Sequence, residues 1–425
     1  MNMAVGNSPK NKANLRIVII GGGPGGTASA LALHKMAAEK SINLDITILE
    51  GKDFNQQRHH NQCVGVLSPP LPSLLEGTLG VPFPRDICIG DIERYVLQSA
   101  GETVSLNDEG EPSIAVRRVQ FDAYMLEQVK ARQIEVFPFR AVDLEFHTDS
   151  VIVYTENESV EADVIIGAFG LDEGSAAMFS RTTAYRQPKH LDSIIVNLPF
   201  NDFDRAAFGS SIHAFLPSNH QIEFGAITPK CDHLTINIAG VKVDAPLMRS
   251  FLKTPEVVKA LHGTENIDDP IWDNLNFYKG RFPRSTARSF YGDRYVMVGD
   301  ASGLVRAFKG KGATTAITTG IRAAETIMNY GITEQAFHTY YRSANRDIIQ
   351  DLPFGRSIRL ATLFMSDYGF MGMVLRAAEK SPALKSALFG AVSGHTPYRE
   401  ILKQVLQPKV VWNILCSIRK TPLET

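Results

Sequence analysis

A short apolar run followed by a glycine-rich turn constrains this chain more than any other feature. Ile17 to Ile20 form the apolar run, and five of the next six residues, GGGPGG, are glycine. Gly21, Gly23 and Gly26 have the G-x-G-x-x-G spacing, which is typical of the turn between strand and helix in a dinucleotide-binding βαβ unit. A helix pattern follows at once. We expect phosphates to bind at the start of this helix, where free N–H groups and the helix dipole favour negative charge.

The second predicted strand ends in an acid at the place where such a site binds ribose. Leu44 to Leu49 form this strand, and Glu50 follows it directly. A carboxylate there accepts hydrogen bonds from a ribose 2′-hydroxyl and repels a 2′-phosphate. The pattern therefore predicts the adenosine of FAD or NAD rather than that of NADP. A solvated acid at a strand end is the alternative interpretation.

Charge, cysteines and apolar runs exclude several other classes of protein. The 425-residue chain has a formal net charge of −1, which gives no reason to expect nucleic acid as a partner. Its four cysteines show no C-x-x-C spacing, which argues against a metal site and favours a reducing compartment. No apolar run reaches the length of about 18 residues that marks a membrane-spanning helix, and residues 1–14 lack the apolar core of a signal peptide. We therefore expect a cytoplasmic protein.

The order of predicted elements indicates an α/β protein with two different sheets. Strand and helix patterns around glycine turns cover 15–174 and return at 286–345, which predicts a Rossmann-like cofactor-binding domain with a parallel sheet. Alternating β-branched residues over 175–285 predict an antiparallel-sheet domain. Helices are expected over 346–425. Residues 51–92 are expected to form a long irregular loop, and loops of that length are usually functional.

A second glycine-rich corner occurs late in the chain. The segment YVMVGDASG predicts a strand that ends at Gly299 and Asp300, and a helix pattern begins beyond Gly310 and Gly312. A carboxylate at a strand end can accept a hydrogen bond from a ribityl hydroxyl. A helix start preceded by glycines can direct N–H groups at the O2 and N1 edge of a flavin. Together with the first glycine turn, this corner predicts one extended FAD site.

Four motifs in order resemble the hydroxylase-like flavoproteins: GGGPGG, RRVQFD, VIIGAFG and YVMVGDASG, within residues 15–345. Within that superfamily the chain is most similar to the geranylgeranyl reductase family of FAD-dependent oxidoreductases. QCVGVLSPP resembles the Cys-Gly-Gly loop of this family, and IHAFLPSNHQIEFGAI resembles its substrate motif. Four positions depart from the pattern: Val64 replaces a glycine, Ala214 a tryptophan, Leu216 a phenylalanine, and Phe169 the acid of an Asp-Gly motif.

The resemblance implies FAD as the cofactor and assigns residues to three roles. The implied cofactor-binding residues are Gly21, Gly23, Pro24, Gly25 and Gly26 for the pyrophosphate, Glu50 for the adenosine ribose, Val142 for the adenine, Arg118, Gly299 and Asp300 for the ribityl and phosphate region, and Gly310 and Gly312 for the flavin edge. The implied catalytic residues are Cys63 and, more weakly, His60. The implied substrate-binding residues are His213, Phe215, Pro217 and Gly225.

The implied activity is the saturation of isoprenoid C=C bonds in a prenyl lipid or another prenyl-chain substrate, with hydride from N5 of the reduced flavin. NAD(P)H, ferredoxin or a reductase would supply the electrons. Two alternatives stay open: a flavin monooxygenase that acts on a hydrophobic small molecule through a C4a-hydroperoxide, and a membrane-associated flavin–quinone electron carrier.

The last predicted helix, over 409–420, combines an apolar face and Trp412 with basic flanks. This pattern suits a peripheral contact with the inner face of a membrane. Packing of the helix on the protein itself is the alternative.

Overall fold

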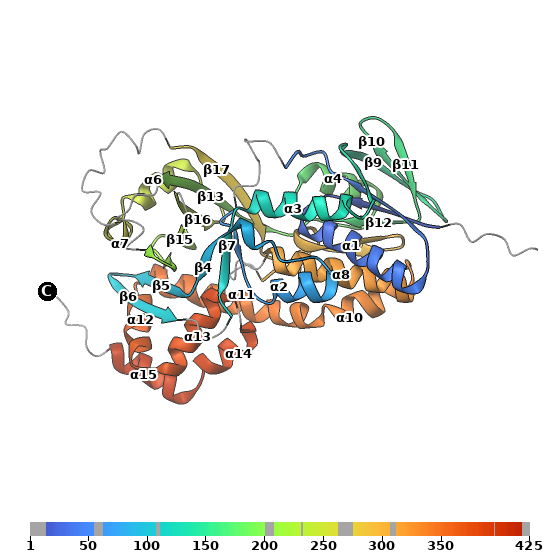
Figure 1. The fold of residues 1–425 in the computed structure, drawn as a ribbon. Helices are drawn as coiled ribbons and strands as arrows, with labels where there is room; N and C mark the ends of the chain where they lie inside the picture. The colour runs from blue at the N-terminus through green and yellow to red at the C-terminus, as the bar shows by residue number, and fades with distance from the viewer. Residues whose placement is uncertain are drawn as a thin grey trace, which may run out of the picture.

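The computed structural model of the chain contains sheets of six and seven strands and two sheets of three strands (Figure 1). The structure describes residues 14–54, 63–107, 111–199, 208–230, 233–261, 275–306, 312–394 and 396–418. Two predicted site residues, His60 and Gly310, lie outside these ranges.

The six-stranded sheet carries the glycine-rich turn. Its strand order is β18-β19-β12-β1-β2-β8, and every neighbouring pair is parallel except β18 with β19. The strands are β1 (Leu15–Ile20), β2 (Leu44–Leu49), β8 (Glu135–Phe137), β12 (Val164–Gly167), β18 (Tyr291–Gly292) and β19 (Tyr295–Met297). The parallel pairing of β12 with β19 returns the late corner of the chain to the same sheet, as predicted.

Both faces of this sheet are covered, which explains its continuous apolar strands. Ile17 and Ile19 face a core formed with the helices, and Val18 and Ile20 face a second core on the opposite side. The first core includes α1 (Pro24–Lys40), α3 (Arg118–Lys130) and α8 (Gly312–Tyr330). The second includes α4 (Glu173–Thr182) and the sheet of β9 (Ala141–Phe146), β10 (Val151–Thr155) and β11 (Ser159–Ala162).

The seven-stranded sheet has the order β17-β13-β16-β15-β14-β5-β6 and is antiparallel except where β14 pairs with β5. Its strands are β5 (Arg94–Ser99), β6 (Glu102–Asn107), β13 (His190–Pro199), β14 (Ser211–Phe215), β15 (Phe224–Pro229), β16 (His233–Gly240) and β17 (Phe277–Pro283). β5 and β6 come from the segment assigned to the first domain by sequence. The antiparallel sheet therefore extends beyond the predicted range 175–285.

The predicted loop over 51–92 is wrong for much of its described part. Leu71, Leu75 and Leu79 are spaced by four residues and are buried in the core that contains α1, so this segment forms helical turns. The helical elements are α2 (Leu71–Ser73), η1 (Leu74–Leu79) and η2 (Arg85–Ile87), and a small sheet is formed by β3 (Val66–Leu67), β7 (Ser113–Val116) and β4 (Cys88–Ile92). The prolines around these leucines hide the helical spacing in the sequence.

Helices cover both faces of the seven-stranded sheet. One face packs on α6 (Ala245–Leu252) and α7 (Pro255–Ala260), and the other packs on C-terminal helices. The remaining elements are η4 (Gly299–Ala301), α9 (Glu334–Ala336), η6 (Phe337–Tyr341), α10 (Arg342–Ala344), α11 (Arg346–Asp367), α12 (Met371–Glu379), α13 (Pro382–Ser393), α14 (Tyr398–Val405) and α15 (Pro408–Ile418). The predicted C-terminal helices are therefore present.

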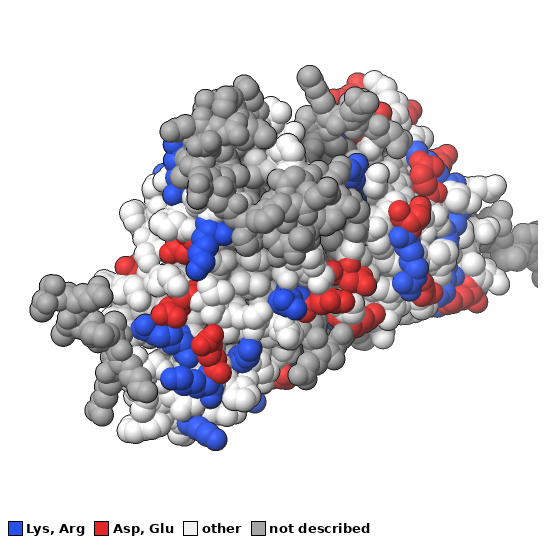
Figure 2. Space-filling view, turned by 60° about the vertical axis from the view of Figure 1, so that its left-hand side comes forward, with Lys and Arg blue, Asp and Glu red and all other residues white. Residues whose placement is uncertain are grey.

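One buried ion pair connects α11 to the seven-stranded sheet. Arg359 pairs with Glu223, whose side chain is 3% exposed. Within the described ranges no single helix is long and apolar enough to cross a membrane, although α11 and α12 together pass that test and are bent by 105°. Lys and Arg side chains gather over the lower end of the molecule in Figure 2, where the C-terminal helices lie in Figure 1.

Candidate functional site

The turn between β1 and α1 requires glycine at two positions. Gly21 has a φ angle of +107°, and a Cβ atom there would lie 2.6 Å from the carbonyl oxygen of Ala168. A Cβ atom on Gly26 would overlap the carbonyl oxygen of Gly21. Gly23 differs, because it is the N-cap residue of α1 and no described atom lies within 4 Å of the place its Cβ would take. Gly21 and Gly26 are therefore required by the backbone of the turn, whereas Gly23 leaves room for a ligand.

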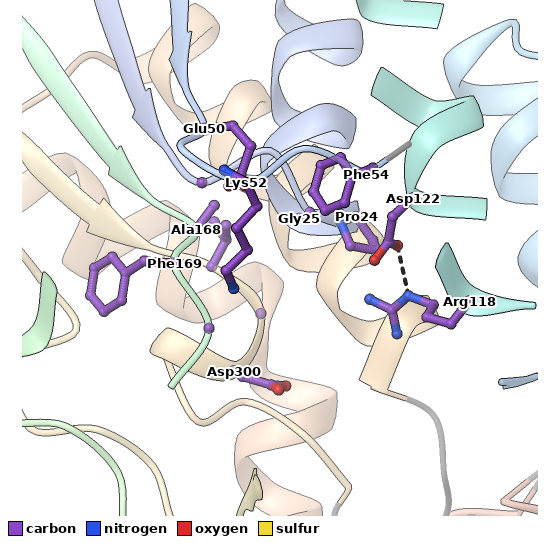
Figure 3. Close-up of a pocket in the computed structure, with 15 residues that line it drawn as sticks. Pro24, Gly25, Glu50, Lys52, Phe54, Arg118, Asp122, Ala168, Phe169 and Asp300 are labelled. Atoms are coloured by element: carbon purple, nitrogen blue, oxygen red, sulfur yellow. Dashed lines mark hydrogen bonds and ion pairs between the residues drawn. The ribbon is translucent and has the colours of Figure 1, made fainter. Parts of the chain in front are cut away.

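A pocket opens in front of this helix start (Figure 3). It lies beyond the carboxyl ends of β1, β2, β12 and β19, where open α/β sheets bind their ligands. The lining residues are Gly21, Gly23, Pro24, Gly25, Glu50, Lys52, Phe54, Arg118, Asp122, Ala168, Phe169, Gly170, Val298, Gly299 and Asp300. The structure thus brings together eight of the predicted cofactor-binding residues.

Glu50 is fixed beside the glycine turn by two backbone N–H groups. Its Oε2 atom accepts a hydrogen bond from the Gly22 N–H at 2.8 Å, and its Oε1 atom accepts one from the Lys52 N–H at 2.8 Å. Each carboxylate oxygen has a further lone pair. The oriented carboxylate can therefore still accept a hydrogen bond from a ligand hydroxyl, as predicted for the ribose.

Arg118 is the charged centre of the opposite wall. It is the first residue of α3, and its Nε atom donates to Oδ1 of Asp122 at 2.7 Å, one helical turn further on. Burial disfavours the charged guanidinium, but the charges of Asp122, Cys63 and Asp300 outweigh it and raise the pKa of Arg118 above its ordinary value. Arg118 therefore keeps its positive charge in this pocket and interacts with Asp122 of its own helix and with groups from two other parts of the chain.

Asp300 lies below Arg118 in Figure 3, on the short helix η4. Burial raises the pKa of Asp300 to about 6, although the charge of Arg118 lowers it. Gly299 before it has a φ angle of +58°, and its N–H donates to Oγ1 of Thr319 on α8 at 2.9 Å. Burial removes the water that would otherwise donate hydrogen bonds to this carboxylate. A ligand hydroxyl at this position can replace that donor.

Cys63 does not line the pocket, but it is near enough to Arg118 to affect the pKa of that residue. Cys63 is exposed, and the Gly65 N–H donates to its sulfur at 3.5 Å. Gly65, with a φ angle of +68°, accepts a hydrogen bond from the N–H of Val116 on β7 at 2.7 Å. The buried ammonium of Lys230 donates to the carbonyl oxygens of both Gly65 and Val116, at 3.3 and 3.1 Å. These bonds attach the loop to the strand that leads directly to Arg118.

The predicted substrate-binding residues lie in and beside the seven-stranded sheet and do not line this pocket. Phe215 of β14 pairs in register with Gly225 of β15 and is 2% exposed. The ring of Phe251 lies 5.6 Å from that of Phe215 and occupies the space over Gly225. His213 contacts Gln98 through Nδ1 at 3.2 Å, and Pro217 follows the strand. Phe215 and Gly225 therefore contribute to the core, and a role for these residues in substrate binding stays a prediction.

Other predicted residues lie outside the pocket lining. Val142 is on β9 and is 47% exposed, and Gly26 is covered by the turn itself. Gly312 begins α8, and a Cβ on it would lie 4.0 Å from Oδ1 of Asp300. The start of α8 therefore adjoins the pocket at Asp300.

Seven lining residues were not among the predicted site residues, and Asp122, Lys52, Phe54 and Phe169 are four of them. Asp122 lies four residues after Arg118, a spacing that predicts an ion pair on a helix. Lys52 lies two residues after Glu50, and its ammonium extends across the pocket in Figure 3. Nothing in the sequence marks Phe54 as a pocket residue except its position shortly after the second strand. Phe169, known only as a departure from a motif, stacks on Phe179 at 5.5 Å.

Known proteins resemble this chain in structure. A geranylgeranyl bacteriochlorophyll reductase-like protein from Thermoplasma acidophilum is 14% identical over 95% of this chain and 100% of its own, with a TM-score of 0.67. A flavoprotein/dehydrogenase from Cytophaga hutchinsonii is 16% identical over 96% and 100%, with a TM-score of 0.66. The flavin-dependent brominase Bmp2 is 14% identical over 92% and 98%, with a TM-score of 0.64. No protein-family model and no curated protein sequence matches the chain.

The chain has the flavoprotein fold. The predicted class is confirmed: a Rossmann-like FAD-binding domain with a parallel sheet, an antiparallel-sheet domain and C-terminal helices. Sequence identities of 14–16% establish a shared fold and no further shared property.

The residues around the pocket fit FAD. The open space at Gly23 lies at the start of α1, where N–H groups and the helix dipole favour a pyrophosphate. Lys52 and Arg118 add positive charge on either side of it, and Glu50 offers an acceptor for the ribose at the end of β2. Asp300 and the start of α8 suit the ribityl chain and the flavin edge. The chemistry of this set matches both halves of the cofactor.

Proposed function

We propose that the chain is an FAD-dependent oxidoreductase that saturates isoprenoid C=C bonds of a prenyl lipid or another prenyl-chain substrate. The observation that carries this proposal is the position of Cys63. Its loop is bonded to the strand before Arg118, and its sulfur is close enough to influence the charge of that residue. The resemblance to geranylgeranyl reductases implies a cysteine loop beside the flavin, and the structural likeness to a geranylgeranyl bacteriochlorophyll reductase-like protein supports the same class.

Reduced FAD, when bound, supplies the hydride in this proposal. The chain's own residues bind and orient the cofactor. The start of α1 would hold the pyrophosphate, Glu50 would accept a hydrogen bond from the adenosine ribose, and Asp300 would accept one from a ribityl hydroxyl. Arg118 neutralises phosphate charge while Asp122 keeps its guanidinium oriented.

Cys63 has the role of proton donor to the second alkene carbon. Its thiol would give a proton to that carbon, and the thiolate left behind would recover a proton from solvent, to which Cys63 is exposed. An isolated alkene accepts hydride poorly, so orientation of the substrate must supply much of the rate.

A flavin monooxygenase that acts on a hydrophobic small molecule is the second candidate. It is favoured by one observation, the structural likeness to the flavin-dependent brominase Bmp2 at nearly the same TM-score. Phe169 counts against direct reduction by NAD(P)H, because it replaces an acid that touches the nicotinamide in the hydroxylases and here stacks on Phe179. A flavin–quinone electron carrier would reduce a quinone and leave alkenes unchanged.

One experiment separates these candidates. The purified flavoprotein is reduced with dithionite without oxygen and incubated with prenyl lipids and with a cell lipid extract. We expect mass spectrometry to find products heavier by two hydrogens for each reduced bond. The Cys63→Ser variant should bind FAD normally and lose most of this activity, whereas Cys416→Ser, an exposed cysteine on α15, should keep it. Oxygen-containing products formed only in air would overturn the reductase proposal.

A further inference from the structure

The last helix presents large apolar side chains to solvent. Within the described part of the chain, Trp412 is 63% exposed, Leu415 is 49% exposed and Val411 is 37% exposed. Leu406, just before the helix, is 63% exposed. Residues 411, 412 and 415 are three and four positions apart, so they lie on one side of α15. We call these four residues the α15 face.

The opposite side of α15 already packs on the protein. Val410 is 1% exposed, and it lies with Ile414 in the core that contains α12 and the end strands of the seven-stranded sheet. Val410 and Ile414 therefore attach the helix to the protein, and the α15 face takes no part in that packing. A polar face would be the ordinary solution at this place, because an amphipathic helix normally directs its polar residues to water. The apolar composition of the α15 face thus indicates an external contact.

Exposed basic residues occur on α15 and on the helix before it. Arg399, Lys403 and Lys409 are exposed on α14 and α15, with Glu400 as the acid among them. Residues 371–425 contain eight Lys or Arg and three Asp or Glu, in a chain whose formal net charge is −1. Figure 2 shows several Lys and Arg side chains, with fewer Asp and Glu among them, at this end of the molecule. The partner is therefore expected to combine an apolar interior with negative charge.

We propose that the α15 face docks on the surface of a bilayer that contains anionic lipids. α15 has 11 residues, and about 20 are needed to cross a bilayer, so the helix lies along the surface. Trp412 enters the interface, where an indole ring has both apolar and polar surroundings. Lys403 and Lys409 contact the lipid headgroups. This docking does not depend on the reaction that the protein catalyses.

A second copy of the chain is a poorer occupant. A two-fold symmetric contact through the α15 face would bring the same basic residues of both copies together. Juxtaposed like charges oppose such a contact. A lipid surface with negative headgroups satisfies the apolar and the basic residues at the same time.

The fluorescence of Trp412 tests the docking directly. The chain has two tryptophans, Trp272 and Trp412, so the Trp272→Phe variant of the holoprotein leaves Trp412 as its single indole. Vesicles of phosphatidylcholine with phosphatidylglycerol should shift the emission of Trp412 to shorter wavelength. The protein should also sediment together with these vesicles. Vesicles of phosphatidylcholine alone should bind much less, and salt should weaken the binding. Emission that stays unchanged with anionic vesicles would overturn the proposal.

Variants distinguish the α15 face from general stickiness. Trp412→Ser with Leu415→Ser should lower vesicle binding at least tenfold, and Lys403→Gln with Lys409→Gln should lower it by about fivefold for each charge. Ile42→Ser is a matched control, because Ile42 is 46% exposed beyond the end of α1 and should not contact lipid. Binding that survives both double variants contradicts the proposal. So does a dimer in solution that Trp412→Ser disrupts, since a second copy would then cover this face.

Discussion

Gly320 of α8 packs directly on Gly25 of α1. A Cβ atom on Gly320 would lie 2.5 Å from the carbonyl oxygen of Gly25 and 2.9 Å from Oγ of Ser29. The two helices begin at opposite ends of the predicted cofactor site, one after the first glycine turn and the other after Asp300. Their close approach therefore joins two segments that lie almost 300 residues apart in the sequence.

The first prediction concerns this contact. We expect Gly320→Ala to lower the free energy of unfolding by about 1–3 kcal/mol, because the added methyl group must push α8 away from α1. Urea denaturation followed by circular dichroism measures this change. Gly77→Ala is the matched control, since no described atom lies within 4 Å of the place its Cβ would take. Equal stability of the two variants would contradict the packing argument.

The glycine turn gives a second prediction, which separates folding from cofactor binding. We expect Gly23→Ala to fold with unchanged stability, because its φ angle of −71° suits alanine and its Cβ meets open space. The same methyl group enters the space for the pyrophosphate, so FAD affinity should fall about tenfold, or about 1.4 kcal/mol. Flavin fluorescence during titration of the FAD-free protein reports this loss.

Gly21→Ala is the comparison for that experiment. Its positive φ angle and the nearby Ala168 carbonyl oxygen should cost at least about 2 kcal/mol of stability. If Gly23→Ala loses stability like Gly21→Ala and keeps FAD, the assigned roles of the two glycines are wrong.

The sequence could predict the cofactor pocket because its chemistry is local. The glycine spacing, the acid at the end of β2 and the Gly-Asp corner each follow directly from a strand, and parallel strands bring their ends to one edge. The ion pair between Arg118 and Asp122 is also predictable from the sequence, because the two residues are four positions apart on a helix.

The position of β5 and β6 could not be predicted in the same way. Alternation indicates that 94–107 forms strands, but it does not identify the strand that pairs with them. β5 pairs in parallel with β14, more than 100 residues later. The burial of Phe215 beneath Phe251 likewise depends on where α6 packs, so a motif that resembles a substrate site contributes here to a core.

The third prediction concerns the ion pair at the start of α3. Arg118→Met should lower the free energy of unfolding by about 3 kcal/mol, because Asp122, which is 2% exposed, loses a partner for its buried charge. Lys130→Met is the control on the same helix. Its pair with Glu127 is exposed on both sides, and its loss should cost less than about 1 kcal/mol. Thermal or urea denaturation that shows equal losses for both variants would argue against a buried pair.

The last prediction is a pH dependence that belongs to Asp300. Its pKa rises from 3.8 in the unfolded chain to about 6 in the folded protein, so the FAD-free fold binds its proton more tightly. Stability from this group is present below about pH 4 and is lost as the pH rises through about 6. Asp300→Asn removes this loss, so the FAD-free variant should gain up to about 3 kcal/mol over the wild type at about pH 7 and almost nothing at about pH 4. Urea denaturation at both pH values checks the difference. The variant should also bind FAD more weakly, because an amide is a poorer acceptor for a ribityl hydroxyl than a carboxylate. A stability gain that is the same at both pH values would show that the ionised carboxylate is not the cause.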